Sequence, residues 1–176
     1  MIALAKKLIE EEDIKAFTTS CGFNAIFQKG LADALDVPVF TSSLLQVPFM
    51  QQIIGTKNTV GIITANKSLL TKDHFDACGF TDDLNFEVFG LEDCKEWSKM
   101  FNEPEASIDM DAVEKEIVGT AVAAVEKNPS IKGIVLECTD LPPYARKISE
   151  ATGLPVLDIV TLIGYMGISL GEIKMF

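Results

Sequence analysis

The sequence predicts an α/β protein of two pseudo-symmetric lobes, in which parallel sheets are flanked by helices and an active-site cleft lies between the lobes. Three observations lead to this fold class. Short apolar runs rich in β-branched residues alternate with longer amphipathic segments along the 176 residues. A βαβ pattern near the N-terminus returns near the C-terminus. No linker rich in proline, glycine or serine separates the two copies, so the lobes are expected to be tightly apposed.

The N-terminal part opens on an amphipathic helix, in which Leu4, Leu8 and Ile9 alternate with charged residues. A βαβ unit follows, and such a unit requires parallel strands. The expected elements are a helix at 3–12, a strand at 14–20, a helix at 24–35, a strand at 37–41 and a helix at 44–54. Residues 1–57 together with 163–176 are expected to form the first, incomplete lobe.

The second lobe is expected to comprise residues 58–162. Its strands are predicted at 59–64, 85–90, 131–137 and 155–160, and its helices at 68–77, 93–101, 112–127 and 144–152. Residues 102–107 are the most loop-like stretch. The helix at 112–127 is expected to end at Asn128-Pro129, because proline cannot continue it. A terminal apolar helix completes the alternation.

The composition limits the partners that this chain can bind. With 26 acidic and 15 basic residues the formal net charge is -11, which disfavours nucleic acid and anionic membranes as partners. The four cysteines show neither a C-x-x-C pair nor a nearby histidine cluster, which disfavours a metal site. A chain of this size does not need disulfides, and its N-terminus does not resemble a signal peptide. We therefore expect a cytoplasmic protein with free thiols.

A repeat equates two of the cysteines. Offset by 117 positions, residues 14–21 align without a gap with residues 131–138, so that Cys21 meets Cys138. Each cysteine precedes a proline by 17 residues, namely Pro38 and Pro155. Both cysteines are thus predicted at the carboxyl end of a parallel strand, where open α/β sheets bind ligands and where a following helix favours a thiolate. Two such thiols can invert a carbon centre, one removing a proton and the other supplying it from the opposite face. This chemistry needs no cofactor, and the sequence contains no glycine-rich phosphate loop.

The flanks of the two cysteines resemble the motifs of the aspartate/glutamate racemase superfamily. This superfamily includes glutamate, aspartate and hydantoin racemases, maleate isomerase and arylmalonate decarboxylase. The carrying segments are residues 19–23, Thr-Ser-Cys-Gly-Phe, and residues 135–143, Val-Leu-Glu-Cys-Thr-Asp-Leu-Pro-Pro. The resemblance covers nearly the whole chain and implies two similar lobes, one cysteine from each, and no cofactor.

The resemblance also implies roles for individual residues. Cys21 and Cys138 would be the acid/base pair, and Asp140 would take the place of a helper acid or histidine. Hydroxyl and amide groups near the strand ends would bind the substrate carboxylate, together with the residues that follow Cys21. The candidate binding residues are Gly22, Phe23, Asn24, Ser42, Ser43, Thr64, Asn66 and Thr139.

The predicted function is therefore a cofactor-independent racemase or isomerase of a small carboxylate, such as an amino acid. Two departures from the family leave alternatives open. Gly22-Phe23-Asn24 follows Cys21, where amino-acid racemases carry Asn-Thr, and the family's opening strand precedes the point where this chain begins. The alternatives are a one-cysteine decarboxylase or isomerase and a non-catalytic carboxylate-binding protein. A homodimer through the apolar stretch 159–166 is also compatible with the sequence.

Other reactive residues have structural interpretations. Cys78 and Cys94 lack a repeat partner and are expected to fill the core. His74, the only histidine, lies in a polar segment and is expected to be solvated. Capping of a helix and support of catalysis are equally compatible with Asp140. Trp97 and Phe101, four residues apart, are expected to pack as a pair.

Overall fold

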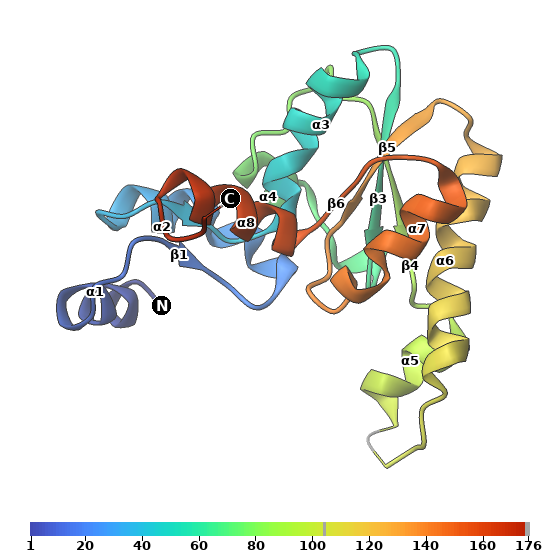
Figure 1. Ribbon diagram of the computed structural model, residues 1–176, viewed down its shortest axis with the longest axis horizontal. Helices are drawn as coiled ribbons and strands as arrows, with labels where there is room; N and C mark the ends of the chain where they lie inside the picture. The colour runs from blue at the N-terminus through green and yellow to red at the C-terminus, as the bar shows by residue number, and fades with distance from the viewer. Residues whose placement is uncertain (104, 175–176) are drawn as a thin grey trace.

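The computed structural model describes residues 1–103 and 105–174, and its main feature is a four-stranded parallel sheet (Figure 1). The strands are β3 (Thr59–Thr64), β4 (Phe86–Gly90), β5 (Ile131–Leu136) and β6 (Val156–Leu157), in the order β4-β3-β5-β6. Each neighbouring pair is parallel. The α/β class and the parallel sheet predicted from the sequence are therefore confirmed.

Helices cover both faces of this sheet, as buried parallel strands require. One face carries α5 (Lys95–Asn102), α6 (Met110–Lys127) and α7 (Ala145–Thr152), and the other carries α3 (Gln46–Ile54) and α4 (Lys72–Ala77). Successive side chains of a strand point to opposite faces. Ile63 accordingly packs in the cluster under α6, whereas Ile62 packs in the cluster under α3. The continuous apolar run of β3 thus supplies both layers of the core.

Capping residues fix the ends of the helices. Asp109 accepts hydrogen bonds from the backbone N–H groups of Asp111 and Ala112, both at 3.1 Å, and so starts α6. Gly153 ends α7 in the left-handed conformation with φ 69°. Asp158 starts α8 (Ile159–Ser169) by accepting from the backbone N–H of Thr161 at 2.7 Å. Over the described part of the chain, no helix combines the length and the apolarity that a membrane span requires.

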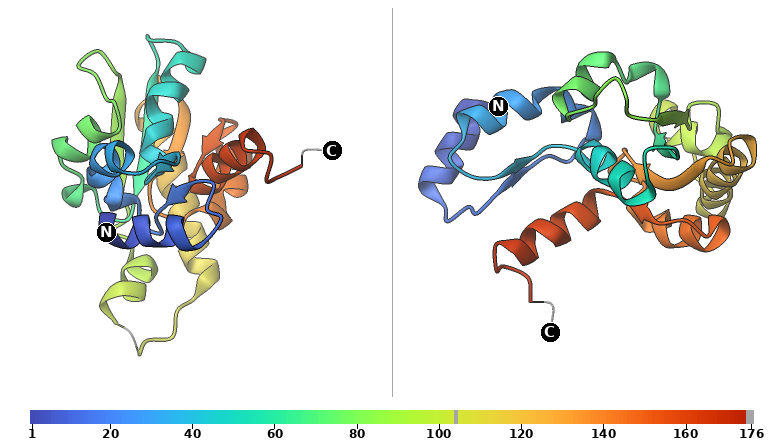
Figure 2. Two further views of the ribbon diagram at one scale, coloured as in Figure 1. Left: turned by 90° about the vertical axis from the view of Figure 1, so that its left-hand side faces the viewer. Right: turned by 90° about the horizontal axis from the view of Figure 1, so that it is seen from above.

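The N-terminal part forms a much smaller sheet beside the main one (Figure 2). Its elements are α1 (Ile2–Glu11), β1 (Phe17–Thr18), α2 (Gln28–Ala34) and β2 (Val39–Phe40). The strands predicted at 14–20 and 37–41 thus shrink to two residues each, because each pairs with one neighbour and Pro38 has no N–H to donate. The described residues therefore contain one full lobe and a small two-stranded sheet, and the prediction of two pseudo-symmetric lobes was wrong in this respect.

The division into residues 1–57 plus 163–176 and residues 58–162 stays a prediction. The C-terminal helix does contact the smaller sheet, since Ile159 and Leu162 of α8 pack against Phe40 of β2. Val160 and Tyr165 on the same helix are exposed, at 58% and 67%. The homodimer suggested for this stretch is likewise a prediction.

Within residues 1–103 and 105–174, four short 3-10 helices follow strand ends. They are η1 (Gly22–Phe27), η2 (Ser43–Leu45), η3 (Lys67–Leu69) and η4 (Pro142–Tyr144). They replace the first turns of helices that the sequence predicts as regular. Because these turns follow β1, β2, β3 and β5, they gather the candidate residues at the carboxyl ends of the strands. The loop predicted at 102–107 begins one residue late, after α5, and Pro104 lies outside the described residues.

Candidate two-cysteine site

The two repeat-related cysteines lie just beyond the carboxyl ends of their strands. Cys21 follows β1, is exposed, and occupies the position before η1 with an extended backbone at φ -148°. Cys138 follows β5 and is half-buried. The equivalent positions that the repeat predicts are therefore present, but their surroundings differ in exposure.

The loops that carry the two cysteines contact each other directly. The hydroxyl of Thr139 donates to the backbone carbonyl of Ser20 at 2.8 Å. On the other side of Cys21, Gly22 is buried, and a Cβ there would overlap with both the carbonyl oxygen and the carboxyl group of Glu137. Only glycine permits this close approach. The structure thus brings Cys21, Gly22, Cys138 and Thr139 together.

Cys138 is held as a thiol. Burial raises its pKa to about 12, the backbone hydrogen bond from Asp140 opposes this shift, and the charges of Asp140, Glu137 and Cys21 add to it. Its sulfur donates to Oδ2 of Asp140 at 3.8 Å. A thiol with this pKa is protonated at neutral pH, so it can offer a proton more readily than accept one. Asp140 is exposed and contacts the thiol of Cys138, a candidate catalytic group. Its side chain does not cap η4, the helix that follows it.

Glu137 is a site residue that sequence reasoning missed. Its side chain is fully buried, Oε2 accepts from the hydroxyl of Thr64 at 2.6 Å, and Oε1 has no hydrogen-bond partner among the described residues. Burial raises its pKa to about 7, against the opposing effect of the Thr64 hydrogen bond. The sequence did contain a signal, because a charged residue stands between a buried strand and a cysteine. The equivalent position in the first repeat is Ser20, which is uncharged.

Several predicted binding residues use their polar groups within the protein. Ser42 accepts from the backbone N–H of Leu44 at 3.2 Å, and Ser43 donates to the carbonyl of Leu136 at 2.6 Å. Both serines are buried, as is Thr64, whose hydroxyl donates to Glu137. A substrate carboxylate would have to replace these bonds, so substrate binding by these hydroxyls stays a prediction.

A cavity of about 300 Å³ lies beside the cysteine loops, at the carboxyl ends of β3 and β4. Two predicted residues line it, namely Phe23 of η1 and Asn66, whose Oδ1 accepts from the backbone N–H of Ser68 at 2.9 Å. Glu92, Trp97 and Phe101 also line it, and sequence reasoning did not place them at the site. These three residues belong to a segment that is not part of the sequence repeat, so their position at the cavity follows from the fold alone.

Asn24 is half-buried, and its backbone N–H donates to the carbonyl of Cys21 at 3.0 Å.

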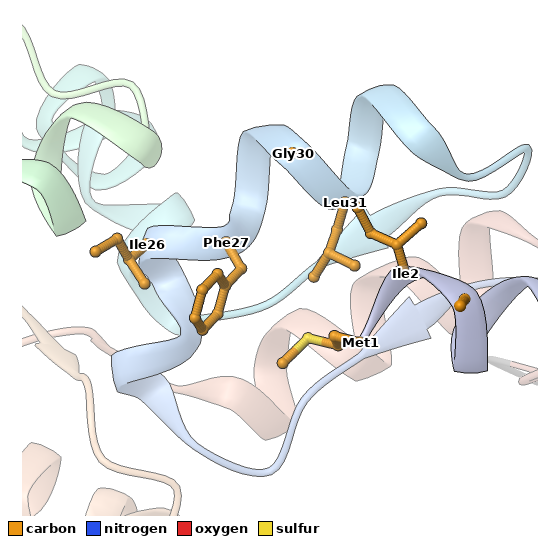
Figure 3. Close-up of a pocket in the computed structure, with 7 residues that line it drawn as sticks. Met1, Ile2, Ile26, Phe27, Gly30 and Leu31 are labelled. Carbon is orange, nitrogen blue, oxygen red and sulfur yellow. The ribbon is translucent and has the colours of Figure 1, made fainter.

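A second hollow, of about 440 Å³, lies between α1 and the helices η1 and α2 (Figure 3). It is lined by apolar residues and a glycine, with Met1, Phe27 and Leu31 among them. Its lining offers no charged or polar side chain that could orient a carboxylate. The hollow is therefore not a candidate site for an acidic substrate.

The remaining reactive residues are structural, and the expectation for His74 was wrong. His74 is only 8% exposed, and its Nδ1 accepts from the backbone N–H of Thr71 at 3.1 Å, which caps α4. The ring of Phe23 packs edge-to-face against the ring of His74, with the two centroids 6.2 Å apart. The polar residues next to His74 in the sequence do not reveal this contact.

Cys78 is buried, and burial raises its pKa to about 12. Cys94 packs against the core, and Trp97 pairs with Phe101 at 5.4 Å.

Comparison with known proteins adds a family to this geometry. Residues 1–163 match the family described as Asp/Glu/Hydantoin racemase. A dimethylsulfoniopropionate lyase from Durusdinium sp. clade D is 32% identical over 158 residues, which are 87% of this chain and 52% of the relative. Dimethylsulfoniopropionate lyase 6 from Emiliania huxleyi is 32% identical over 180 aligned positions, covering 96% of this chain and 45% of the relative. The chain spans about half the length of these relatives.

A solved structure supports the fold independently. The Gly74Cys mutant of arylmalonate decarboxylase aligns with a TM-score of 0.63 at 15% identity, covering 96% of this chain and 72% of that one. The parallel strands, the cysteines beyond the ends of β1 and β5, and the match over residues 1–163 agree with one another. The chain belongs to the Asp/Glu/Hydantoin racemase family.

Proposed function

We propose that this chain forms an enzyme site that removes the proton next to the carboxylate of a small organic acid, with Cys21 as the base and Cys138 as the protonated partner. The contact between the two cysteine loops is the observation that supports this proposal. Thiols from two touching loops can act on one substrate. The exposed Cys21 can also return the proton that it takes to solvent.

The reaction begins with the thiolate of Cys21 taking the α-proton, and the electron pair of the C–H bond moves into an enolate. The enolate then has two outcomes. If it is protonated from the opposite face by the thiol of Cys138, the carbon centre is inverted, which is the racemase chemistry predicted from the sequence. If a leaving group stands on the next carbon, its bond breaks, the leaving group takes that bonding pair, and a double bond forms.

The unequal thiols favour the second outcome, a lyase reaction. A racemase works in both directions, so each thiol must serve as the base in turn. Cys138, with a pKa of about 12, is poorly suited to the thiolate role at neutral pH. A β-elimination needs only one base, and the two relatives described above are named as lyases of dimethylsulfoniopropionate. With that compound the products would be dimethyl sulfide, acrylate and one proton.

The racemase remains the second candidate, because the paired cysteine loops provide two thiols. The one-cysteine decarboxylase alternative also fits a single protonated thiol. It would release carbon dioxide and place the proton of Cys138 on the resulting carbanion. The products therefore separate the three reactions.

The test incubates the full chain in deuterated water with dimethylsulfoniopropionate, a panel of amino acids and a substituted malonate. Dimethyl sulfide is measured by gas chromatography, and α-deuteration, inversion and carbon dioxide are measured in parallel. We expect dimethyl sulfide release that is lost in Cys21→Ser and kept in Cys94→Ser, a matched control at a thiol outside the site. Turnover that survives in Cys21→Ser would contradict the assignment of the base. Absence of every product with the wild type would contradict the proposed function.

A further inference from the structure

The cavity beside the cysteine loops has a lining that differs from the loops themselves. It lies where β3 and β4 end, the edge at which parallel sheets bind ligands. Three aromatic side chains line it, together with one carboxylate: Phe23, Trp97, Phe101 and Glu92. The chain offers no lysine or arginine among the described lining residues. An anionic group would therefore find no charged partner there.

The aromatic side of the cavity comes from two separate elements. Phe23 belongs to η1, two residues after Cys21, and Phe101 belongs to α5. Phe101 packs on the buried Trp97 with ring centroids 5.4 Å apart, which holds its ring at the cavity while leaving it 55% exposed. The faces of aromatic rings carry partial negative charge and attract cations, quaternary ammonium ligands in particular.

The carboxylate of Glu92 lies just beyond β4. It folds back over Gly90, where a Cβ would overlap with its carboxyl group, so glycine at the strand end makes room for it. Oε2 accepts from the backbone N–H of Lys67 at 3.2 Å. Among the described residues no lysine or arginine forms an ion pair with Glu92. Its charge is thus available to a cationic ligand.

We propose that this cavity binds the methylated cationic group of a zwitterionic substrate, a sulfonium or quaternary ammonium, through Phe23, Phe101 and Glu92. The inference names the substrate class of the proposed reaction and therefore rests on the proposed function. With the cation in this cavity, the rest of the substrate extends past Phe23 toward the turn that carries Cys21. The net charge of -11 further favours a cationic group over a second carboxylate.

Binding can be measured apart from turnover, because Trp97 is the only tryptophan in the sequence and lines this cavity. Its fluorescence is followed during titration with three probes. Dimethylsulfoniopropionate carries both charges, 4-methylpentanoate has the same shape without the cation, and tetramethylammonium has the cation without the carboxylate. Titrations with the two carboxylates are carried out in Cys21→Ser, so that no turnover disturbs them. We expect the sulfonium compound to bind about tenfold more tightly than 4-methylpentanoate, which lacks the cation.

Two substitutions assign the effect to the cavity. Glu92→Gln keeps an acceptor for the Lys67 N–H and removes the charge, and Phe101→Ala removes an exposed ring. Each substitution is expected to reduce the preference for the sulfonium compound to about threefold or less, because each removes one contact to the cation. Glu126→Gln, which makes the same change at an exposed position of α6, is expected to leave the preference unchanged.

The outcomes separate this inference from the proposed function. Equal binding of the sulfonium compound and its isostere, or a preference that persists in Glu92→Gln and Phe101→Ala, would overturn the inference even if dimethyl sulfide were released. Conversely, tetramethylammonium binding that depends on Glu92 and Phe101, without any turnover by the wild type, would support the cavity assignment and count against the proposed reaction.

Discussion

The two parts of the molecule that carry the cysteines share one sequence pattern but have different surroundings. Cys138 follows a six-residue strand that pairs with β3 and β6 and lies between two layers of helices. Cys21 follows a two-residue strand that pairs with β2 in a separate small sheet. Burial therefore keeps Cys138 protonated, whereas Cys21 faces water. Equivalent positions in a repeat can thus take unequal chemical roles, because neighbouring elements set the environment of each thiol.

The largest expected effect comes from exchanging each thiol in turn. Cys21→Ser removes the proposed base and is expected to lower the rate of α-proton removal at least about 100-fold. Cys138→Ser removes a group that is proposed to stay protonated, and a hydroxyl can still donate a hydrogen bond, so a smaller loss is expected. Solvent deuterium exchange and product release measure both. Equal losses in the two variants would break the proposed difference and favour the racemase.

Substitutions in the large sheet should lower the free energy of unfolding more than substitutions in the small sheet. Ile134→Ala opens a cavity in β5 and is expected to lower the free energy of unfolding by about 2–5 kcal/mol. Val39→Ala in β2 removes methyl groups that are only half-buried, and about 1 kcal/mol is expected. Urea unfolding of both variants checks this order. A larger loss from Val39→Ala would mean that the small sheet carries more of the stability than its contacts indicate.

The buried carboxyl group between the two cysteine loops predicts a pH effect on stability. The pKa of Glu137 in the folded protein is about 7, above the ordinary value of 4.5, so between these values the folded protein binds more protons than the unfolded one. The free energy of unfolding should therefore fall as the pH rises from 4.5 through 7, by roughly 3 kcal/mol from this group. Above that range its contribution is constant.

Glu137→Gln should flatten this dependence, because the amide cannot ionise and can still accept from Thr64. Urea unfolding of the wild type and the variant between pH 4.5 and 8 measures the difference, and Glu126→Gln serves as an exposed control. If the two curves stayed parallel across this range, the carboxyl group would not titrate there.

The contrast between the two parts also explains how far the sequence could be interpreted. The strand predicted at 59–64 is confirmed as β3 residue for residue, because a continuous apolar run is typical of a strand buried on both faces. The strand predicted at 14–20 is only two residues long, because strand length depends on pairing partners that the local sequence does not contain. The sequence predicts both cysteine positions at strand ends. Glu92 and Phe101 reach the cavity only through tertiary packing, so no spacing rule could have placed them there.

The smallest expected effect on stability comes from the hydrogen bond between the cysteine loops. Thr139→Val removes the hydrogen bond to the Ser20 carbonyl and is expected to lower the free energy of unfolding by only about 1 kcal/mol. Thr139→Val should slow product release by more than this small loss of stability would suggest, because a loop shift near 1 Å can slow a reaction about 100-fold. Thr139→Ser keeps the hydroxyl and serves as the matched control. Product release and urea unfolding are measured on both variants. If Thr139→Val lost stability but kept the wild-type rate, the contact between the loops would serve the fold alone, and the proposed cooperation of Cys21 and Cys138 would lose its structural support.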